Sequence, residues 1–197
     1  MSLIEQLGKA AFSQMTRNAS AKTGLNESAI AALMPMATAM LMNGLKKNVA
    51  KPGGAEALSK ALARHDGSLL GNLSRTGDDD VIADGRAILG HILGGKQGQA
   101  QESLAKAAGA NADQIGNLLA MAAPAILAGL GKAKREQGLD AGALAQLVTA
   151  ESKNAETAAP NELGGLLKWL DTDGDGRIDD NLAELASKGL SSLLGKR

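Results

Sequence analysis

The stretch ADQIGNLLAMAAPAILAGLGKAK, residues 112–134, decides the fold of this chain. No charged side chain occurs from Ile115 to Gly131, while Asp113 precedes that run and two lysines follow it, as the helix dipole favours. Apolar residues surround the whole circumference of such a helix, so it belongs in a core or in a membrane. Its length is at the bottom of the membrane-spanning range of about 17 to 25 residues, and alanine and glycine dominate its composition. The sequence therefore predicts a buried core helix, with a membrane hairpin as the alternative.

A diverged copy of this stretch lies 85 positions earlier, at residues 27–49. A shift of 85 superposes nine identical residues over the 24 positions 24–47, among them Gly44 on Gly129 and Leu45 on Leu130. Each copy follows an asparagine, Asn26 or Asn111, which can cap the first free amides of a helix. Self-similarity at a fixed spacing indicates an internal repeat. We expect two diverged helical units built around long buried helices.

The composition indicates a multihelical, all-α protein. Phe12 and Trp169 are the only aromatic residues, so strand-forming side chains are scarce, whereas alanine and leucine abound. The chain has no cysteine, which excludes disulfides, thiolate metal ligands and thiol nucleophiles.

Four segments follow from the hydrophobic pattern along the chain. Residues 1–80 form the first helical unit and residues 81–150 the second. The stretch ESKNAETAAPNE, residues 151–162, has no apolar period and is interpreted as a linker. Residues 163–197 form a tail with two short helices around an acidic loop, which is a helix–loop–helix arrangement.

The acidic loop DTDGDGRIDD at residues 171–180 matches most of an EF-hand calcium loop. Aspartates fill the first, third, fifth and ninth positions, a glycine stands at the turn, and the seventh residue offers its carbonyl. Carboxylates this close repel each other without a cation, and hard oxygen ligands select calcium or magnesium. The predicted metal ligands are Asp171, Asp173, Asp175, Arg177, Asp179 and Asp180.

The twelfth position of this loop departs from the pattern, because Leu182 stands where the closing glutamate belongs. Asp180, Glu184 or water is expected to replace that ligand, with moderate affinity. The alternative is a solvated Asp/Gly turn without metal. Since the chain has a single such loop, we expect bound calcium to hold the tail together rather than to act as a switch.

Charge and composition limit the partners. The chain has 21 basic and 21 acidic residues, and nucleic-acid binding needs a basic footprint, so a helix-turn-helix DNA binder is only a weak alternative. Residues 3–15 show helical apolar spacing that suits a core or an oligomer contact. The N-terminus has Glu5 and no long apolar run, so a signal peptide is not expected. The sequence predicts a cytoplasmic protein with a protein partner or self-association, and without nucleic acid, membrane or small-molecule substrate.

No catalytic motif occurs in the sequence. His65 and His91 are the only histidines, and neither has metal-ligand spacing. We therefore predict a non-enzymatic protein. The alternative is a hydrolase whose site assembles only in the fold from Asp66, Asp84 and the two histidines. Three further acids, residues 78–80, precede an apolar helix and are expected to cap it.

Several motifs resemble the YidB-like family, bacterial helical proteins of unknown function. The family shows a DG…ILGHLFG element, an apolar helix with an Ala-Pro pair ending in Leu-Gly-Lys, and a near-terminal LD-DGDG-DD loop. The chain is similar over roughly residues 20–195, with Leu93 in place of phenylalanine, and the matching residues are Asp84, Gly85, residues 88–91, Gly94, residues 119–124, residues 129–132 and residues 170–180. The resemblance implies an all-helical protein and adds no activity.

Overall fold

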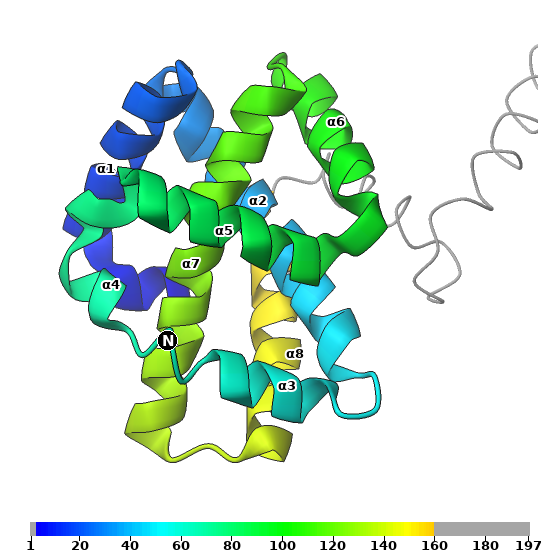
Figure 1. Cartoon of the computed structure of the whole chain (residues 1–197). Helices are drawn as coiled ribbons and strands as arrows, with labels where there is room; N and C mark the ends of the chain where they lie inside the picture. The colour runs from blue at the N-terminus through cyan, green and yellow to red at the C-terminus, as the bar shows by residue number, and fades with distance from the viewer. Residues whose placement is uncertain (1–2, 160–197) are drawn as a thin grey trace, which may run out of the picture. The chain divides into compact units, whose positions relative to one another are not determined.

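The computed structural model describes residues 3–159, and every element of that part of the chain is helical (Figure 1). The all-α prediction is therefore confirmed. In chain order the elements are α1 (Leu3–Thr23), α2 (Glu27–Val49), α3 (Gly54–Ala61), α4 (Ser68–Gly71), the 3-10 helix η1 (Leu73–Gly77), α5 (Asp79–Leu93), the 3-10 helix η2 (Gly94–Lys96), α6 (Gln97–Ala108), α7 (Ala112–Gln137) and α8 (Ala141–Ala158).

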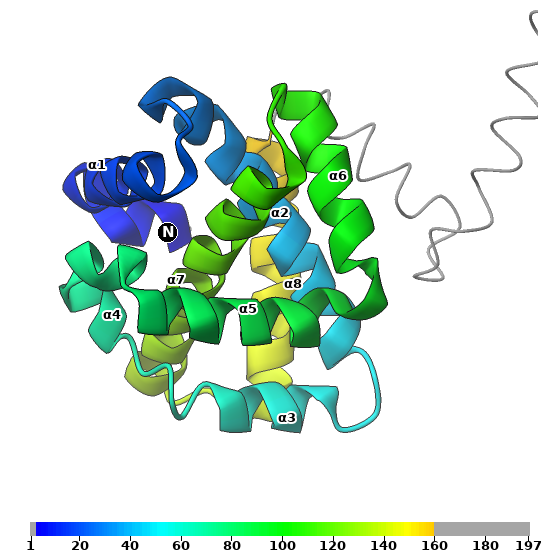
Figure 2. The same cartoon turned by 45° about the horizontal axis from the view of Figure 1, so that its top comes forward.

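Helix α7 lies at the centre of the fold and contains the long apolar stretch at residues 112–134. It contacts α1, α2, α4, α5, α6 and η1, and its apolar residues from Leu118 to Ala125 are all buried. Helix α2 packs against α8 over much of its length. Figure 2 shows α5 crossing in front of α7, with α8 behind.

Helices α2 and α7 are long and apolar enough to cross a membrane by length and composition. In the structure, 56% and 78% of their most apolar windows are buried within the fold. Both therefore serve as core helices of this unit, as the sequence predicted. That the protein has no contact with a membrane stays a prediction.

The two predicted asparagine caps are present. The Asn26 side chain accepts a hydrogen bond from the Ala29 amide at 2.8 Å, and Asn111 accepts one from the Gln114 amide at 2.9 Å. The Gln114 side chain in turn accepts from the Asn111 amide, which completes a capping box. These bonds fix the starts of the two long helices, whereas the proposed duplication itself stays a sequence prediction.

The predicted linker at residues 151–162 is wrong over its first part, because α8 continues to Ala158. Val148, Ser152, Ala155 and Ala159 are buried at helical spacing. The Ser152 hydroxyl also donates to the Asn43 side-chain oxygen of α2 at 3.1 Å. Small side chains carry this packing, so the segment shows little apolar period in sequence. Both predicted units, 1–80 and 81–150, belong to one compact unit that extends to Ala159, and the predicted tail lies outside the described residues.

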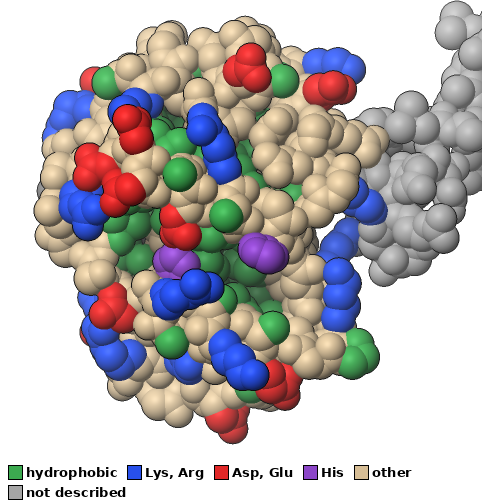
Figure 3. Space-filling model, viewed as in Figure 1, with side chains coloured by type: hydrophobic (Ala, Val, Ile, Leu, Met, Phe, Trp, Pro, Cys, Tyr) green, Lys and Arg blue, Asp and Glu red, His purple; other side chains and the backbone are tan. Residues whose placement is uncertain are grey.

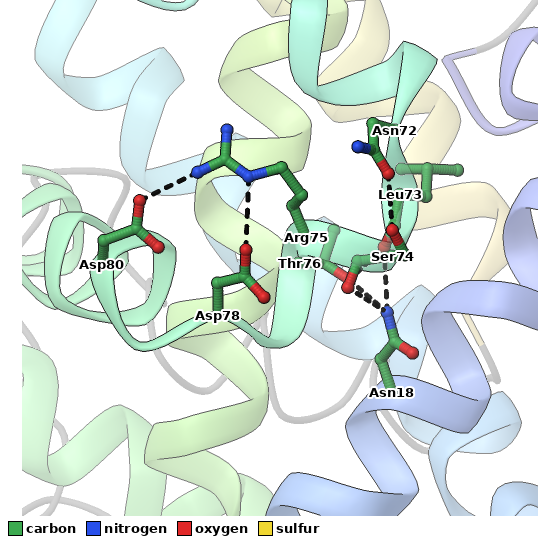
Figure 4. Close-up of polar contacts among 8 residues, drawn as sticks. All are labelled: Asn18, Asn72, Leu73, Ser74, Arg75, Thr76, Asp78 and Asp80. Carbon is green, nitrogen blue, oxygen red and sulfur yellow. Dashed lines mark hydrogen bonds and ion pairs between the residues drawn. The ribbon is translucent and has the colours of Figure 1, made fainter.

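The three acids at the start of α5, residues 78–80, include the N-cap residue Asp78, whose side chain makes no capping hydrogen bond, contrary to expectation. The carboxylate of Asp78 accepts from Arg75, which also bonds Asp80 (Figure 4). The carboxylate of Asp79 accepts instead from Lys22 of α1 at 2.9 Å, and this bond lowers the pKa of Asp79. The acids therefore join α5 to η1 and α1.

Asn18 of α1 makes a second connection to η1. Its side-chain amide donates to the carbonyls of Leu73 and Ser74 at 2.9 and 3.1 Å, and it lies beside the Thr76 hydroxyl (Figure 4). Because Leu73 is buried, the bond to its carbonyl satisfies a backbone group that water reaches poorly.

Helix α5 crosses α7 with the two backbones in contact. Gly85 is buried at the crossing, and a Cβ atom added there would lie 1.8 Å from the Ala120 carbonyl oxygen. No side chain fits in that space, so glycine is required at this position for steric reasons. The alanine-rich surface of α7 allows the close approach.

We predict that Gly85→Ala strongly destabilises the protein, because α5 must move away from α7. The expected loss is about 2 to 3 kcal/mol, at the upper end of the range of about 1 to 3 kcal/mol for overpacking a core. Gly90→Ala is the matched control, since a Cβ there meets nothing within 4 Å on the same helix. It should stabilise by about 0.5 to 1 kcal/mol through helix propensity. Urea unfolding followed by circular dichroism measures both, and equal midpoints for the two variants would refute the contact.

Candidate functional site

A groove of about 1040 Å³ opens between α3 and α5. Its floor is apolar and comes from α2, α3, α5 and α7, with Leu45, Val49, Leu58, Ile88 and Leu127. Both histidines lie at this hollow, over hydrophobic side chains (Figure 3). The groove is therefore a cleft over buried apolar residues with polar groups at its edges, as ligand-binding clefts commonly are.

The α3 wall presents its face at helical spacing, with Ala57, Lys60, Ala61 and Arg64. The turn from α2 passes through Gly53, whose φ of +72° is left-handed, and brings α3 back along α2. The far end of this wall rests on α7, where a Cβ at Gly131 would lie 1.8 Å from the His65 carbonyl oxygen.

A hydrogen bond from α7 also holds the last turn of α3. The Lys134 ammonium donates to the Ser59 carbonyl at 2.9 Å. Side-chain donors near a helix C-terminus satisfy carbonyls that have no partner within the helix. The α3 wall is therefore attached to α7 by a backbone contact and by a charged hydrogen bond.

The α5 wall presents Asp84, Ala87, Ile88 and His91, which follow one another at three- and four-residue steps. The contact of Gly85 with α7 fixes the position of the N-terminal part of this wall. Its C-terminal end is held by Asn48 of α2, whose side-chain amide donates to the carbonyls of His91 and Ile92 at 2.9 and 3.2 Å.

Three of the four residues of the hydrolase alternative come together in the groove. His65 Nε2 lies 3.8 Å from Asp84 Oδ2, and the His65 side chain is only 16% exposed. His91 lines the same groove two turns along α5. Such a pair can in principle accept a proton from water, but no lining residue carries a hydroxyl or thiol nucleophile.

Asp66, the fourth residue, has a different role. Its carboxylate accepts from the Ser68 amide at 3.0 Å and lies 3.6 Å from Arg135 of α7. Hydrogen bonds from Ser68, and then the charge of Arg135, lower the pKa of Asp66. A carboxylate with a lowered pKa stays ionised and makes a poor proton donor. Asp66 therefore stabilises the start of α4.

The rim of the groove is basic. Lys51, Lys60 and Arg64 are exposed, and Asp84 is the one carboxylate among the lining residues. Within residues 3–159, neither Lys60 nor Arg64 pairs with a carboxylate. This rim is not predicted from the sequence, because Lys51 is separated from Lys60 and Arg64 along the chain. A signal was present, since residues 57–64 repeat small and basic side chains at helical spacing.

The predicted calcium ligands lie outside the described residues, since all of them fall within 160–197. The prediction for Asp171, Asp173, Asp175, Arg177, Asp179 and Asp180 therefore stands untested by the structure. Among the described residues, no group of three or more histidines and acids is placed to hold a metal ion.

A family model described as a bacterial protein of unknown function (DUF937) matches residues 3–133. The matched part contains every residue that lines the groove and ends before the predicted calcium loop. Neither the curated proteins nor the solved structures gave a significant match.

We predict that Gly131→Ala displaces the α3 wall, because the new methyl group overlaps the His65 carbonyl. The expected loss of stability is about 1 to 3 kcal/mol. Gly116→Ala on the same helix is the control, since a Cβ there meets only the flexible end of Gln101. The ring signals of the two histidines in NMR spectra give the local readout. His65 should shift in Gly131→Ala and stay unchanged in Gly116→Ala, and identical spectra for both variants would contradict the assignment.

Proposed function

The chain belongs to the bacterial DUF937 family of unknown function, and on that premise we propose that it is a non-enzymatic protein-interaction protein. YidB is a member of this family, so the family resemblance found in the sequence is confirmed. The proposed interaction surface is the groove between α3 and α5. A cytoplasmic location and a lack of contact with nucleic acid and membrane are part of the same proposal.

The single observation behind this proposal is the groove between the two walls, whose rim is exposed while its apolar floor is buried. Leu58, Ile88 and Leu127 are themselves packed, with small exposed alanines and cations above them. Apolar clefts with a polar rim are the usual form of a protein-binding surface on a single chain. The groove also lies wholly within the family domain.

The hydrolase remains the second candidate, favoured by the His65–Asp84 approach at 3.8 Å in the same groove. The two candidates differ in what the histidine does. A catalytic His65 would be required for turnover of a substrate, whereas an interaction groove needs only its shape and charge. The lack of hydroxyl and thiol side chains among the lining residues supports the interaction.

We also propose that the loop at residues 171–180 binds one calcium ion that stabilises the tail. The support is the spacing of its aspartates and the glycine at the turn. With a single loop and no closing glutamate, the site suits a structural ion better than a sensor.

To test the groove, the photo-crosslinker p-benzoylphenylalanine is placed at position Ala87 in the full chain, in its own bacterium. Ala83 is the control, because it is an exposed alanine on the same helix that does not line the groove. We expect a discrete crosslinked protein from position Ala87 alone. Once identified and purified, that protein must bind the unmodified chain directly in calorimetry.

A second copy of the chain in the crosslink would assign the groove to self-association. Identical products from both positions, or a purified partner that fails to bind, would refute the interaction function. Hydrolysis of an ester or peptide substrate that is lost in His65→Ala would identify the groove as the active site of a hydrolase.

The calcium site is tested by titrating metal-free protein in a calorimeter, with Trp169 fluorescence as a second signal. Trp169 is the only tryptophan and lies two residues before the loop. We expect one binding site, lost in the double variant Asp173→Asn with Asp175→Asn, together with a rise in melting temperature on calcium binding.

Glu102→Gln is the control for this titration, since it removes an exposed acid from α6 and leaves the loop unchanged. It should bind calcium as the unmodified protein does. No heat and no fluorescence change at millimolar calcium would show that Leu182 at the twelfth position abolishes the site.

A further inference from the structure

We propose that the groove accepts an amphipathic α-helix of a partner protein, with acidic residues beside its apolar stripe. This inference rests on the proposed interaction function and adds the chemistry of the occupant. Its first support is the distance between the walls. Helix α5 contacts α7 at Ala120, and the end of the α3 wall contacts α7 at Gly131.

These two contacts are eleven residues apart on α7, which corresponds to about 16 Å along the helix axis. Packed helices have axes about 8 to 10 Å apart. One helix placed between two walls therefore needs about 16 to 20 Å. The spacing set by α7 is that of one inserted helix, with Leu127 at the floor between the contacts. Directly over α7 the His65 and Asp84 side chains span this spacing, 3.8 Å apart, so the inserted helix lies beyond this pair, toward His91 and Lys51. Figures 1 and 2 both show α3 and α5 running side by side across this gap.

The side chains of the walls favour close approach of another helix. Ala57, Ala61 and Ala87 line the groove, and small residues let helix backbones come near each other. The bulky apolar side chains of the groove lie at its floor. An occupant must therefore supply the large side chains itself, which is the role of the apolar stripe of an amphipathic helix.

The length of the walls limits the contact. On α5 it runs from Asp84 to His91, which is two helical turns. On the other side it runs from Ala57, on α3, to Arg64, in the turn that follows α3. The turn at Lys51–Gly53 lies at one end, and the approach of His65 to Asp84 narrows the other. The groove therefore contacts about two to three turns of the inserted helix.

The positive charges at the rim of the groove favour a partner helix with acidic residues. Lys51, Lys60 and Arg64 are exposed at the rim, while the single lining carboxylate, Asp84, already faces His65. Glutamates or aspartates that flank the apolar stripe would pair with Lys60 and Arg64, which have no carboxylate partner within residues 3–159. A basic helix would meet like charge at each of these positions.

The test uses two synthetic helical peptides of equal apolar stripe, one flanked by glutamates and one by lysines. Each is titrated by fluorescence anisotropy against the full chain. We expect the glutamate peptide to bind and the lysine peptide to bind at least tenfold more weakly. In the variant Lys60→Glu with Arg64→Glu the preference should reverse, because the charges at the rim reverse.

Two controls separate the groove from the rest of the surface. Lys106→Glu with Lys153→Glu changes the same net charge on α6 and α8 and should leave the preference as it was. Ala87→Trp fills the groove and should abolish binding of the glutamate peptide, whereas Ala83→Trp should not. Circular dichroism checks that every variant is folded.

No binding of the glutamate peptide at millimolar concentration overturns the inference, as does equal binding of both peptides or binding that survives Ala87→Trp. Concentration-dependent sedimentation that is lost in Ala87→Trp without peptide would show a second copy as the occupant and overturn it too. Because crosslinking from position Ala87 needs no assumption about the partner, it can succeed while the peptides fail. The two outcomes thus separate the interaction function from the acidic-helix inference.

Discussion

The contact between the backbones of α5 and α7 at Gly85 and Ala120 is the constraint on which the rest of the structure depends. A chain with one phenylalanine and one tryptophan cannot fill wide gaps between helices with large rings. It packs by bringing helices close together instead, and alanine and glycine make that possible. The same solution recurs at Gly131, where α7 meets the end of the α3 wall, and at Gly54, where α3 begins against the Asn48 carbonyl.

The sequence predicted the helices well because their signals are local. Asn26 and Asn111 each act on amides three residues ahead, and the uncharged run of α7 indicates burial without any knowledge of its neighbours. The end of α8 was missed because Ser152 and Ala155 are small and weakly apolar. Their burial depends on α2, more than a hundred residues earlier, which no periodicity in the segment reveals.

The candidate site was predictable only in part, for the same reason. Asp84 and His91 share a helix face, so their common orientation follows from spacing, whereas the approach of His65 depends on where the turn after α3 meets α7. Asp66 adjoins His65 in sequence and yet pairs with Ser68 and Arg135 instead. The basic rim has a similar origin, since Lys51, Lys60 and Arg64 become one surface only when the turn after α2 folds back.

Both walls of the groove come from residues 54–92, and α7, which spaces them, follows later in the chain. During synthesis α3 and α5 therefore leave the ribosome before the helix on which they rest. Until residue 131 has emerged, no backbone contact fixes their separation, and the apolar floor lacks Leu127. Domains fold as units once their chain is available, so the groove forms only when this unit is nearly complete. A nascent or truncated chain ending before α7 thus carries the residues of the groove without its shape.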